Sequence, residues 1–231
     1  MASKGGDSAK VQRMRTMIAA GLGIAAVAVA AVGLFFVLQP VGEVDAGQHY
    51  VTLPAANRAR TGEVVVTEYF SYGCIHCMNF DPQIEEWKDE LPEGVRFERV
   101  PVAFSPPWRN LAAAYYAAGD LEVRERNHTR LFDAIHRAQL PLQSSDALAQ
   151  FFDGHGTDAV SFRRAMSSPA VRRALDTGQR RAQEDQIQAV PTVVVDGRYR
   201  ITGGELSRRQ VLEVADVLIE RELAARQGGA G

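Results

Sequence analysis

Residues 64–77 read VVVTEYFSYGCIHC, an apolar run that leads into a pair of cysteines. Its first seven residues are mostly β-branched, aromatic or otherwise apolar, which is typical of a buried strand. Gly73 supplies a turn, and Cys74-Ile75-His76-Cys77 then opens a segment, residues 75–91, with apolar residues at helical spacing. A lone Cys-x-x-Cys pair at the start of a helix, directly after a strand, indicates thiol–disulfide redox chemistry.

The chain of 231 residues has only these two cysteines, which limits the alternatives. A zinc site needs about four ligands, and no second cysteine pair or spaced histidine pair supplies the rest. A covalent haem site needs histidine directly after the second cysteine, where Met78 stands. A purely structural disulfide closing so short a loop would contribute little chain entropy. We therefore predict a redox-active cysteine pair that uses no metal and no other cofactor.

The N-terminal region predicts export of everything that follows it. Residues 17–38 are uncharged and follow four lysines and arginines within residues 1–16. As a helix at ~1.5 Å per residue the segment reaches ~33 Å, enough to cross a bilayer core. The flanking charge predicts that residues 1–16 stay in the cytoplasm. A cleaved signal peptide is the alternative, since residues 44–46 suit a cleavage site, but the apolar segment exceeds the usual ~7–15 residues.

The exported part is mildly acidic. From residue 39 on it has 22 basic residues (26 less 4) and 27 acidic ones (28 less 1), a net charge of −5. This balance, without a large basic patch, excludes nucleic-acid binding. The part is also long enough to bury its own core, so it needs no disulfide staples.

Strand signals fall into two groups that a long helical stretch separates. The first group comprises residues 50–53, an expected edge strand, residues 63–70, a central strand, and residues 95–100, a third strand. The second group comprises residues 191–195 and 199–201, joined by Asp196-Gly197, a strong hairpin signal. Ser207 then suits the N-cap of a last amphipathic helix.

This order predicts an α/β protein with a thioredoxin-like fold that an all-helical insertion interrupts, preceded by one N-terminal transmembrane helix. The expected divisions are a cytoplasmic basic tail (1–16), an anchor or signal sequence (17–38), a linker (39–49), a thioredoxin-like domain (50–106 and 187–226), a helical insertion (107–186) and a disordered tail (227–231).

The two cysteines have different expected roles. At a helix N-terminus, unpaired N–H groups and the helix dipole stabilise a thiolate, so the pKa of Cys74 should lie below that of a free thiol. A low pKa makes Cys74 a good leaving group and stabilises the reduced protein, which makes the disulfide an oxidant. Cys77, one turn further, would face inward and resolve a mixed disulfide at Cys74. His76 either directs a hydrogen bond or charge at the Cys74 sulfur or is an ordinary exposed residue.

Glu68 and Pro191 are further candidates. Glu68 interrupts an apolar strand; if buried, its pKa rises and it can carry a proton for Cys77, whereas a solvent-facing Glu68 would do nothing. Pro191 begins the returning strand, where proline is tolerated. It is either an ordinary turn proline or, in this fold, a cis residue beside the active sulfur.

Together, residues 68–77, the helical stretch and residues 190–197 resemble the DsbA family of thiol:disulfide oxidoreductases. The resemblance covers roughly residues 50–223. It implies a monomeric periplasmic donor of disulfides to newly exported, unfolded proteins with cysteine pairs, reoxidised by a DsbB-like, quinone-linked membrane oxidase. It further implies that Cys74 is attacked, that Cys77 is its buried partner and that His76 is the main thiolate stabiliser.

By the same resemblance, Glu68 corresponds to a buried acid and Pro191 to a cis-proline. The backbone of Val190 would pair with an extended substrate that Ile75 also contacts. Two features depart from the family pattern. The dipeptide between the cysteines is usually Pro-His, whereas here it is Ile-His. The second departure is a retained anchor, because it is atypical of the family's freely soluble members. It would hold the enzyme at the bacterial inner membrane, whereas a cleaved segment would leave it soluble in the periplasm.

Two alternative functions stay open. A disulfide isomerase or reductase on the same fold is the nearest, although isomerases of this superfamily generally dimerise through an extra domain that residues 39–49 have no room for. A non-enzymatic holdase or binding module, whose cysteines are incidental, is the second. Full biological activity of a Cys74→Ala variant would support that second alternative.

Overall fold

The structure is a computed structural model that describes residues 12–15, 17–18, 44–54, 62–204 and 206–228. The chain divides into two compact units, Met1–Val41 and Gly42–Gly231, and the fold below is that of the second. Most of the predicted membrane segment, residues 19–38, lies outside the described residues. Within the described ranges, no helix is long and apolar enough to cross a membrane.

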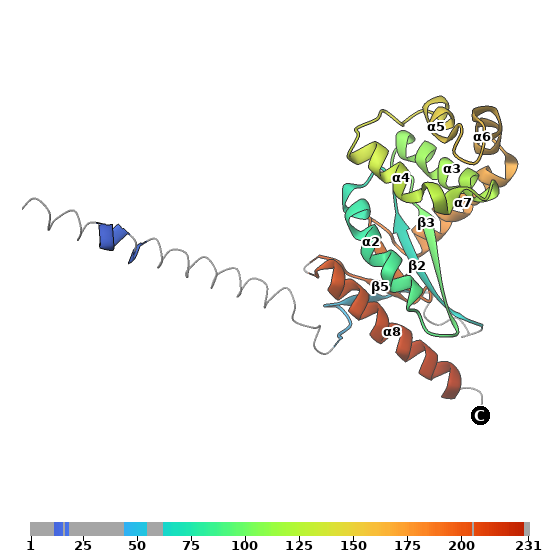
Figure 1. The fold of residues 1–231 in the computed structure, drawn as a ribbon. Helices are drawn as coiled ribbons and strands as arrows, with labels where there is room; N and C mark the ends of the chain where they lie inside the picture. The colour runs from blue at the N-terminus through green and yellow to red at the C-terminus, as the bar shows by residue number, and fades with distance from the viewer. Residues whose placement is uncertain (1–11, 16, 19–43, 55–61, 205, 229–231) are drawn as a thin grey trace, which may run out of the picture. The chain divides into compact units, whose positions relative to one another are not determined.

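The order of elements confirms an α/β core that helices interrupt (Figure 1). In chain order the elements are β1 (Tyr50–Thr52), β2 (Val64–Phe70), α2 (Ile75–Asp89), β3 (Val95–Pro101), α3 (Pro106–Asp120), α4 (Arg124–His136), α5 (Ser145–Phe152), α6 (Ala159–Met166), α7 (Pro169–Glu184), β4 (Thr192–Val195), β5 (Tyr199–Ile201) and α8 (Arg208–Gly228). The strands form one sheet in the order β1-β5-β4-β2-β3. Strand β2 pairs with parallel β3 on one side and antiparallel β4 on the other.

Strand β2 has the burial expected from its apolar sequence. Six of its seven residues are buried, because the strand has neighbours on both sides and helices over the sheet. The predicted hairpin is confirmed between β4 and β5. Asp196 and Gly197 have φ angles of 56° and 59°, as a two-residue turn with two left-handed positions requires.

Ordered structure begins before the predicted edge strand. Strand β1 pairs with β5 at the edge of the sheet, as expected. The preceding residues 44–49, expected to belong to a linker, also contact the sheet. The Thr202 N–H donates to the His49 carbonyl at 2.9 Å, and the Thr202 hydroxyl donates to the Gln48 carbonyl at 2.9 Å. The last part of the expected linker is therefore held against the end of β5.

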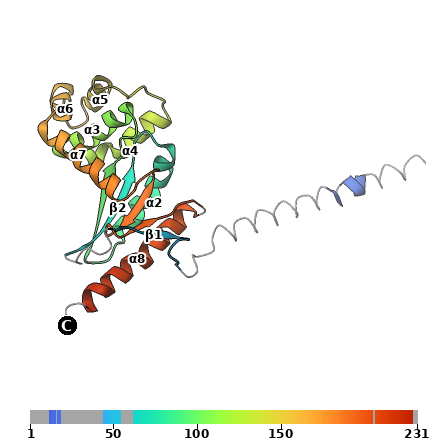
Figure 2. The ribbon, with the colours of Figure 1, turned by 180° about the vertical axis from the view of Figure 1, so that it is seen from behind.

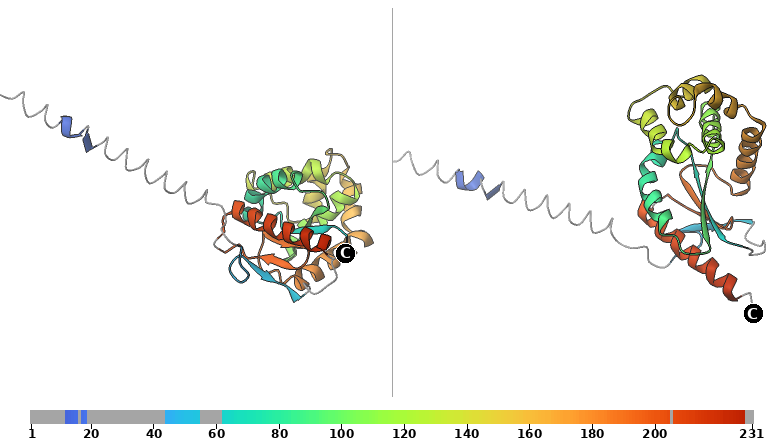
Figure 3. Two further views of the ribbon diagram at one scale, coloured as in Figure 1. Left: turned by 90° about the horizontal axis from the view of Figure 1, so that it is seen from below. Right: turned by 45° about the vertical axis from the view of Figure 1, so that its right-hand side comes forward.

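The helices α3–α7 gather at one end of the sheet, and α8 lies toward the other (Figures 1 and 2). Helices α2 and α8 contact each other, and α8 also contacts β4 and β5 (Figure 3). Ser207 caps α8 as predicted, since its hydroxyl accepts the Gln210 N–H at 3.3 Å. The helix continues to Gly228, two residues into the expected tail.

The apolar core of the helical insertion extends to the cysteines. One cluster of buried side chains joins residues of α3–α7 with Phe70, Tyr72, Cys74 and Cys77. Since the strand end, the turn and the start of α2 share this core, the insertion and the cysteine pair are parts of the same packed unit.

Candidate active site

Cys74 is the N-cap of α2, as the sequence predicted. Its backbone is extended (φ −103°, ψ 115°), and its Sγ accepts the Cys77 N–H at 3.4 Å. The preceding turn closes on Ser71, whose hydroxyl accepts the Gly73 N–H at 3.1 Å and whose carbonyl accepts the Cys74 N–H at 3.0 Å. Both cysteines are free thiols, so the structure represents the reduced state.

The two thiols have opposite pKa shifts. The pKa of Cys74 is lowered to about 6, first by a hydrogen bond from the Cys77 thiol; partial burial opposes the shift, and the N–H groups of Cys77 and His76 add to it. Burial raises the pKa of Cys77, whose side chain is 0% exposed. Near neutral pH the pair is therefore a thiolate at Cys74 and a thiol at Cys77.

His76 and Ile75 lie on the exposed side of this helix start. The charge of His76 also lowers the pKa of Cys74, but less than the hydrogen bonds from Cys77 do. Among the described residues the His76 imidazole has no hydrogen-bond partner. Ile75 is 44% exposed and leaves an apolar surface beside the Cys74 sulfur.

Residues distant in sequence complete the site. The Val190–Pro191 peptide bond is cis, and the Val190 carbonyl accepts a hydrogen bond from the Cys74 thiol at 3.4 Å. Two cavities flank the cysteine. One, of about 410 Å³, is lined by His76, Phe80, Pro191, Gly203, Leu206, Ser207, Arg208 and Val211. The other, of about 560 Å³, lies between Gly73, Trp108 and the loop that contains Leu140.

Glu68 is buried, as the first of its two interpretations requires, and it has a partner that the sequence did not reveal. The Arg99 Nε donates to its carboxylate at 2.6 Å, and β2 and β3 place the two residues opposite each other. Burial raises the pKa of Glu68 despite the attraction of Arg99.

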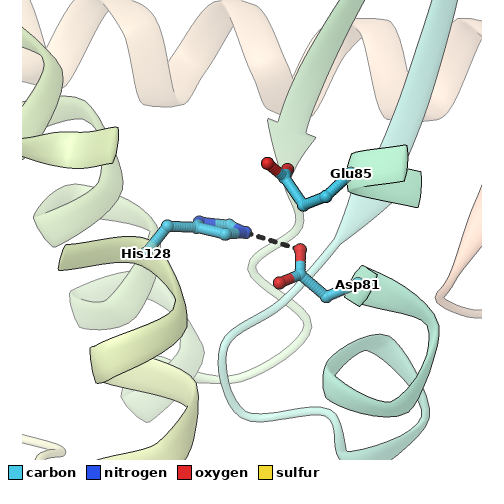
Figure 4. A group of neighbouring side chains, drawn as sticks. All are labelled: Asp81, Glu85 and His128. Carbon is cyan, nitrogen blue, oxygen red and sulfur yellow. Dashed lines mark hydrogen bonds and ion pairs between the residues drawn. The ribbon is translucent and has the colours of Figure 1, made fainter. Parts of the chain in front are cut away.

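Arg99 is the centre of a buried ion-pair network. Besides Glu68 it donates to Glu85 at 2.7 Å and to Asp81 at 3.0 Å, both on α2. His128 of α4 points at Asp81, with its Nε2 2.9 Å from the Asp81 carboxylate (Figure 4). The Arg99 side chain is only 7% exposed, and the enclosed carboxylates of Glu68 and Asp81 share it as a cation. Glu85 is 38% exposed and also pairs with Lys88 at 2.7 Å.

Asp81, Glu85 and His128 also bring three potential metal ligands within 4.8 Å of one another. The Arg99 guanidinium already binds both carboxylates, and the second ring nitrogen of His128 is 2.8 Å from the Tyr72 hydroxyl. A cation would have to displace Arg99 from this cluster. The arrangement therefore fits a closed ion-pair network better than a metal centre.

Sequence reasoning missed these residues, although two patterns point to them. In strand β3, Arg99 falls on the same alternating face as Val95 and Phe97, where an apolar residue is expected. His128 precedes Leu131 and Phe132 by three and four residues, which places it on the buried face of α4.

Comparisons with known proteins agree with this geometry. A family model for the DSBA-like thioredoxin domain matches residues 83–208. The thiol:disulfide interchange protein DsbA of Azotobacter vinelandii is 37% identical over 186 residues, which cover 80% of this chain and 87% of that protein. The crystal structure of the oxidoreductase DsbA from Xylella fastidiosa superposes with a TM-score of 0.73 at 33% identity, over 79% of this chain and all of that one.

Pseudomonas aeruginosa DsbA gives a similar result in both comparisons. Its sequence is 32% identical over 194 residues, covering 83% of this chain and 92% of that protein. Its crystal structure has a TM-score of 0.74 at 33% identity, over 79% of this chain and 96% of the other. With Cys74 and Cys77 at the start of α2 as its active-site pair, the chain belongs to the DsbA family of thiol:disulfide oxidoreductases.

Proposed function

We propose that this chain donates its Cys74–Cys77 disulfide to newly exported proteins in the periplasm. The observation that carries the proposal is the asymmetry of the pair: the pKa of Cys74 is lowered to about 6, while Cys77 is enclosed. A thiolate of low pKa leaves readily, so Cys74 is easily displaced from a mixed disulfide with a client, and the reduced enzyme is stabilised.

The exchange has two steps. A client thiolate attacks the Sγ of Cys74; a new sulfur–sulfur bond forms, the Cys74–Cys77 bond breaks, and the Cys77 sulfur takes up a proton to become a thiol. A second client thiolate then attacks the client sulfur of this mixed disulfide, and Cys74 leaves as a thiolate. The client loses two electrons and gains a disulfide, and the enzyme gains two electrons as its dithiol.

We assign supporting roles to the remaining candidate residues. The charge of His76 assists the thiolate, and Glu68 exchanges the proton that Cys77 gains or loses. The Val190 carbonyl, next to Pro191, is positioned to accept a backbone hydrogen bond from an extended client when Cys74 is a thiolate, because the thiolate no longer donates to it. Ile75 provides apolar contact beside the entering cysteine.

The test uses the oxidised full-length chain and a reduced, unfolded client with two cysteines. The expected result is one client disulfide formed for each enzyme disulfide consumed, and none with Cys74→Ala or Cys77→Ala, since neither variant can form the Cys74–Cys77 disulfide. Transfer by Cys74→Ala at the unaltered rate would refute the proposal. If the enzyme instead rearranges scrambled client disulfides without added oxidant, it is an isomerase.

We further propose that residues 17–38 anchor the enzyme in the bacterial inner membrane, where a DsbB-like, quinone-linked oxidase regenerates the disulfide. The uncharged segment after a basic tail supports the anchor. Family membership supports the reoxidation partner. The mass of the exported protein tests the anchor: an intact N-terminus in the membrane fraction supports it, and a soluble chain that begins near residue 47 refutes it. Quinone-dependent reoxidation by membranes tests the partner.

A further inference from the structure

Two histidines of α4 hold the same residue of the active-site turn. The His128 Nδ1 is 2.8 Å from the Tyr72 hydroxyl, and the His136 Nε2 is 2.8 Å from the Tyr72 carbonyl. A carbonyl only accepts, so the His136 Nε2 carries a proton and donates it. The two histidines are slightly more than two turns apart and lie on neighbouring parts of one helix face. The helical insertion therefore holds both the side chain and the main chain of Tyr72.

Tyr72 stands two residues before Cys74 and is firmly enclosed. Its ring is 2% exposed and meets the Phe132 ring of α4 edge-on, with centroids 4.9 Å apart. The rest of the turn is closed by Ser71, which binds the N–H groups of Gly73 and Cys74. Through Tyr72, the position of α4 fixes where this turn sits.

His128 also holds the helix that begins at Cys74. Its Nε2 is 2.9 Å from Asp81, which lies on α2 four residues after Cys77. One imidazole therefore bridges the turn that carries the Cys74 side chain and the helix that supplies the Cys77 N–H. With its Nε2 proton donated to Asp81, its Nδ1 accepts from the Tyr72 hydroxyl, so both ring nitrogens are satisfied.

We infer that His128 and His136 are positioning residues for the reactive sulfur of Cys74. The hydrogen bond from the Cys77 N–H to the Cys74 Sγ spans 3.4 Å. A small shift of the turn against α2 lengthens this bond and weakens the stabilisation of the thiolate. By holding the turn to α4 and to α2 together, the two histidines keep the sulfur within reach of the helix N-terminus.

The competing explanation is that these histidines only fill and satisfy the core of the insertion. They share an aromatic cluster with Phe70, Tyr72 and Phe132, and buried polar groups in such clusters commonly serve stability alone. A stability role predicts a lower melting temperature with the pKa of Cys74 unchanged. A positioning role predicts that the pKa of Cys74 moves.

The experiment measures the pKa of Cys74 in the reduced full-length chain, from the rate of iodoacetamide alkylation against pH. Tyr72→Phe and His128→Gln should each raise it by about half a unit, about threefold in the thiol–thiolate equilibrium, the order of effect expected for a charge at a helix end. The double variant should show about the same shift as either single one, because both break one connection. His155→Gln, at an exposed histidine between α5 and α6, is the matched control and should leave the pKa unchanged.

Two variants test the contact between His136 and the Tyr72 carbonyl. His136→Leu removes the donor to the Tyr72 carbonyl and should raise the pKa of Cys74, whereas His136→Gln keeps an amide donor and should restore part of the shift. Tyr72→Phe removes one oxygen and keeps the ring, so it provides a result even where a histidine variant fails to fold. An unchanged pKa in Tyr72→Phe and in the folded histidine variants, or fully additive shifts in the double variant, would overturn the inference.

This inference rests on the proposed exchange at Cys74, and the same titration separates the two. An ordinary thiol pKa in the unaltered chain would reject the proposed function itself. A low pKa in the unaltered chain that none of the variants moves would reject only the positioning role.

Discussion

Replacing Cys77 with alanine tests the cause of the low pKa of Cys74 directly. The first cause of that pKa, about 6, is a hydrogen bond from the Cys77 thiol. Cys77→Ala removes this donor but keeps the backbone N–H, which lies 3.4 Å from the Cys74 sulfur. A hydrogen bond to a charged group contributes about 1.5–3 kcal/mol, and one pKa unit corresponds to about 1.4 kcal/mol. The pKa of Cys74 should therefore rise by about 1–2 units, to between about 7 and 8.

The rate of alkylation by iodoacetamide, followed from pH 4 to pH 10, gives this pKa in a chain with a single cysteine. Cys77→Ser is the matched control, because its hydroxyl keeps a donor in the same enclosed place and should give an intermediate value. A pKa of Cys74 that stays near 6 in Cys77→Ala would contradict the assigned role of the Cys77 thiol. It would mean that the N–H groups at the start of α2 and the charge of His76 are sufficient on their own.

Three further predictions concern stability. The folded pKa of Cys74, about 6, lies below the ~8.5 of an unfolded cysteine, so its stabilisation of the reduced protein is present above pH ~8.5 and is lost as the pH falls through 6. Urea titrations should show about 2 kcal/mol less stability at pH 6 than at pH 8, and Cys74→Ala should abolish this difference. Arg99→Leu leaves the enclosed carboxylates of Glu68 and Asp81 without their shared cation and should cost about 3–5 kcal/mol in denaturant titrations. Arg209→Leu, at an exposed ion pair on α8, should cost less than ~1 kcal/mol; equal costs for the two would contradict the role of the network. In Gly73→Ala the new Cβ would lie 2.5 Å from the Trp108 Nε1, so the indole or the turn must move. Melting should show a loss of about 1–3 kcal/mol with altered tryptophan fluorescence, and an unchanged melting curve would show that the contact yields freely.

Local sequence patterns predicted the framework of the fold because its elements depend on neighbouring residues. The apolar run of β2, the Asp196-Gly197 turn and the cap at Ser207 are each determined within a few positions, and the structure has all three. The placement of Cys74 at the start of α2 follows from the same local signals.

The ion-pair network could not be predicted in this way. Arg99, Asp81 and His128 come from three elements that are distant in sequence, and arginine and aspartate are most often exposed. Their burial depends on how α4 packs against α2, which the long helical stretch of the sequence did not specify. For Arg99 the sequence did indicate burial, since the alternation of β3 places it where an apolar residue is expected.

The enclosure of Cys77 gives the chain a built-in reporter of its own folding. In the native reduced protein a thiol reagent has access to Cys74, which is 8% exposed, and not to Cys77, which is 0% exposed. In the unfolded chain both sulfurs are accessible. The number of modified cysteines per molecule, one or two by mass, therefore counts native and unfolded molecules in the same sample. Such a count needs no spectroscopic label and no purified reference state, so it can follow unfolding in a crude extract.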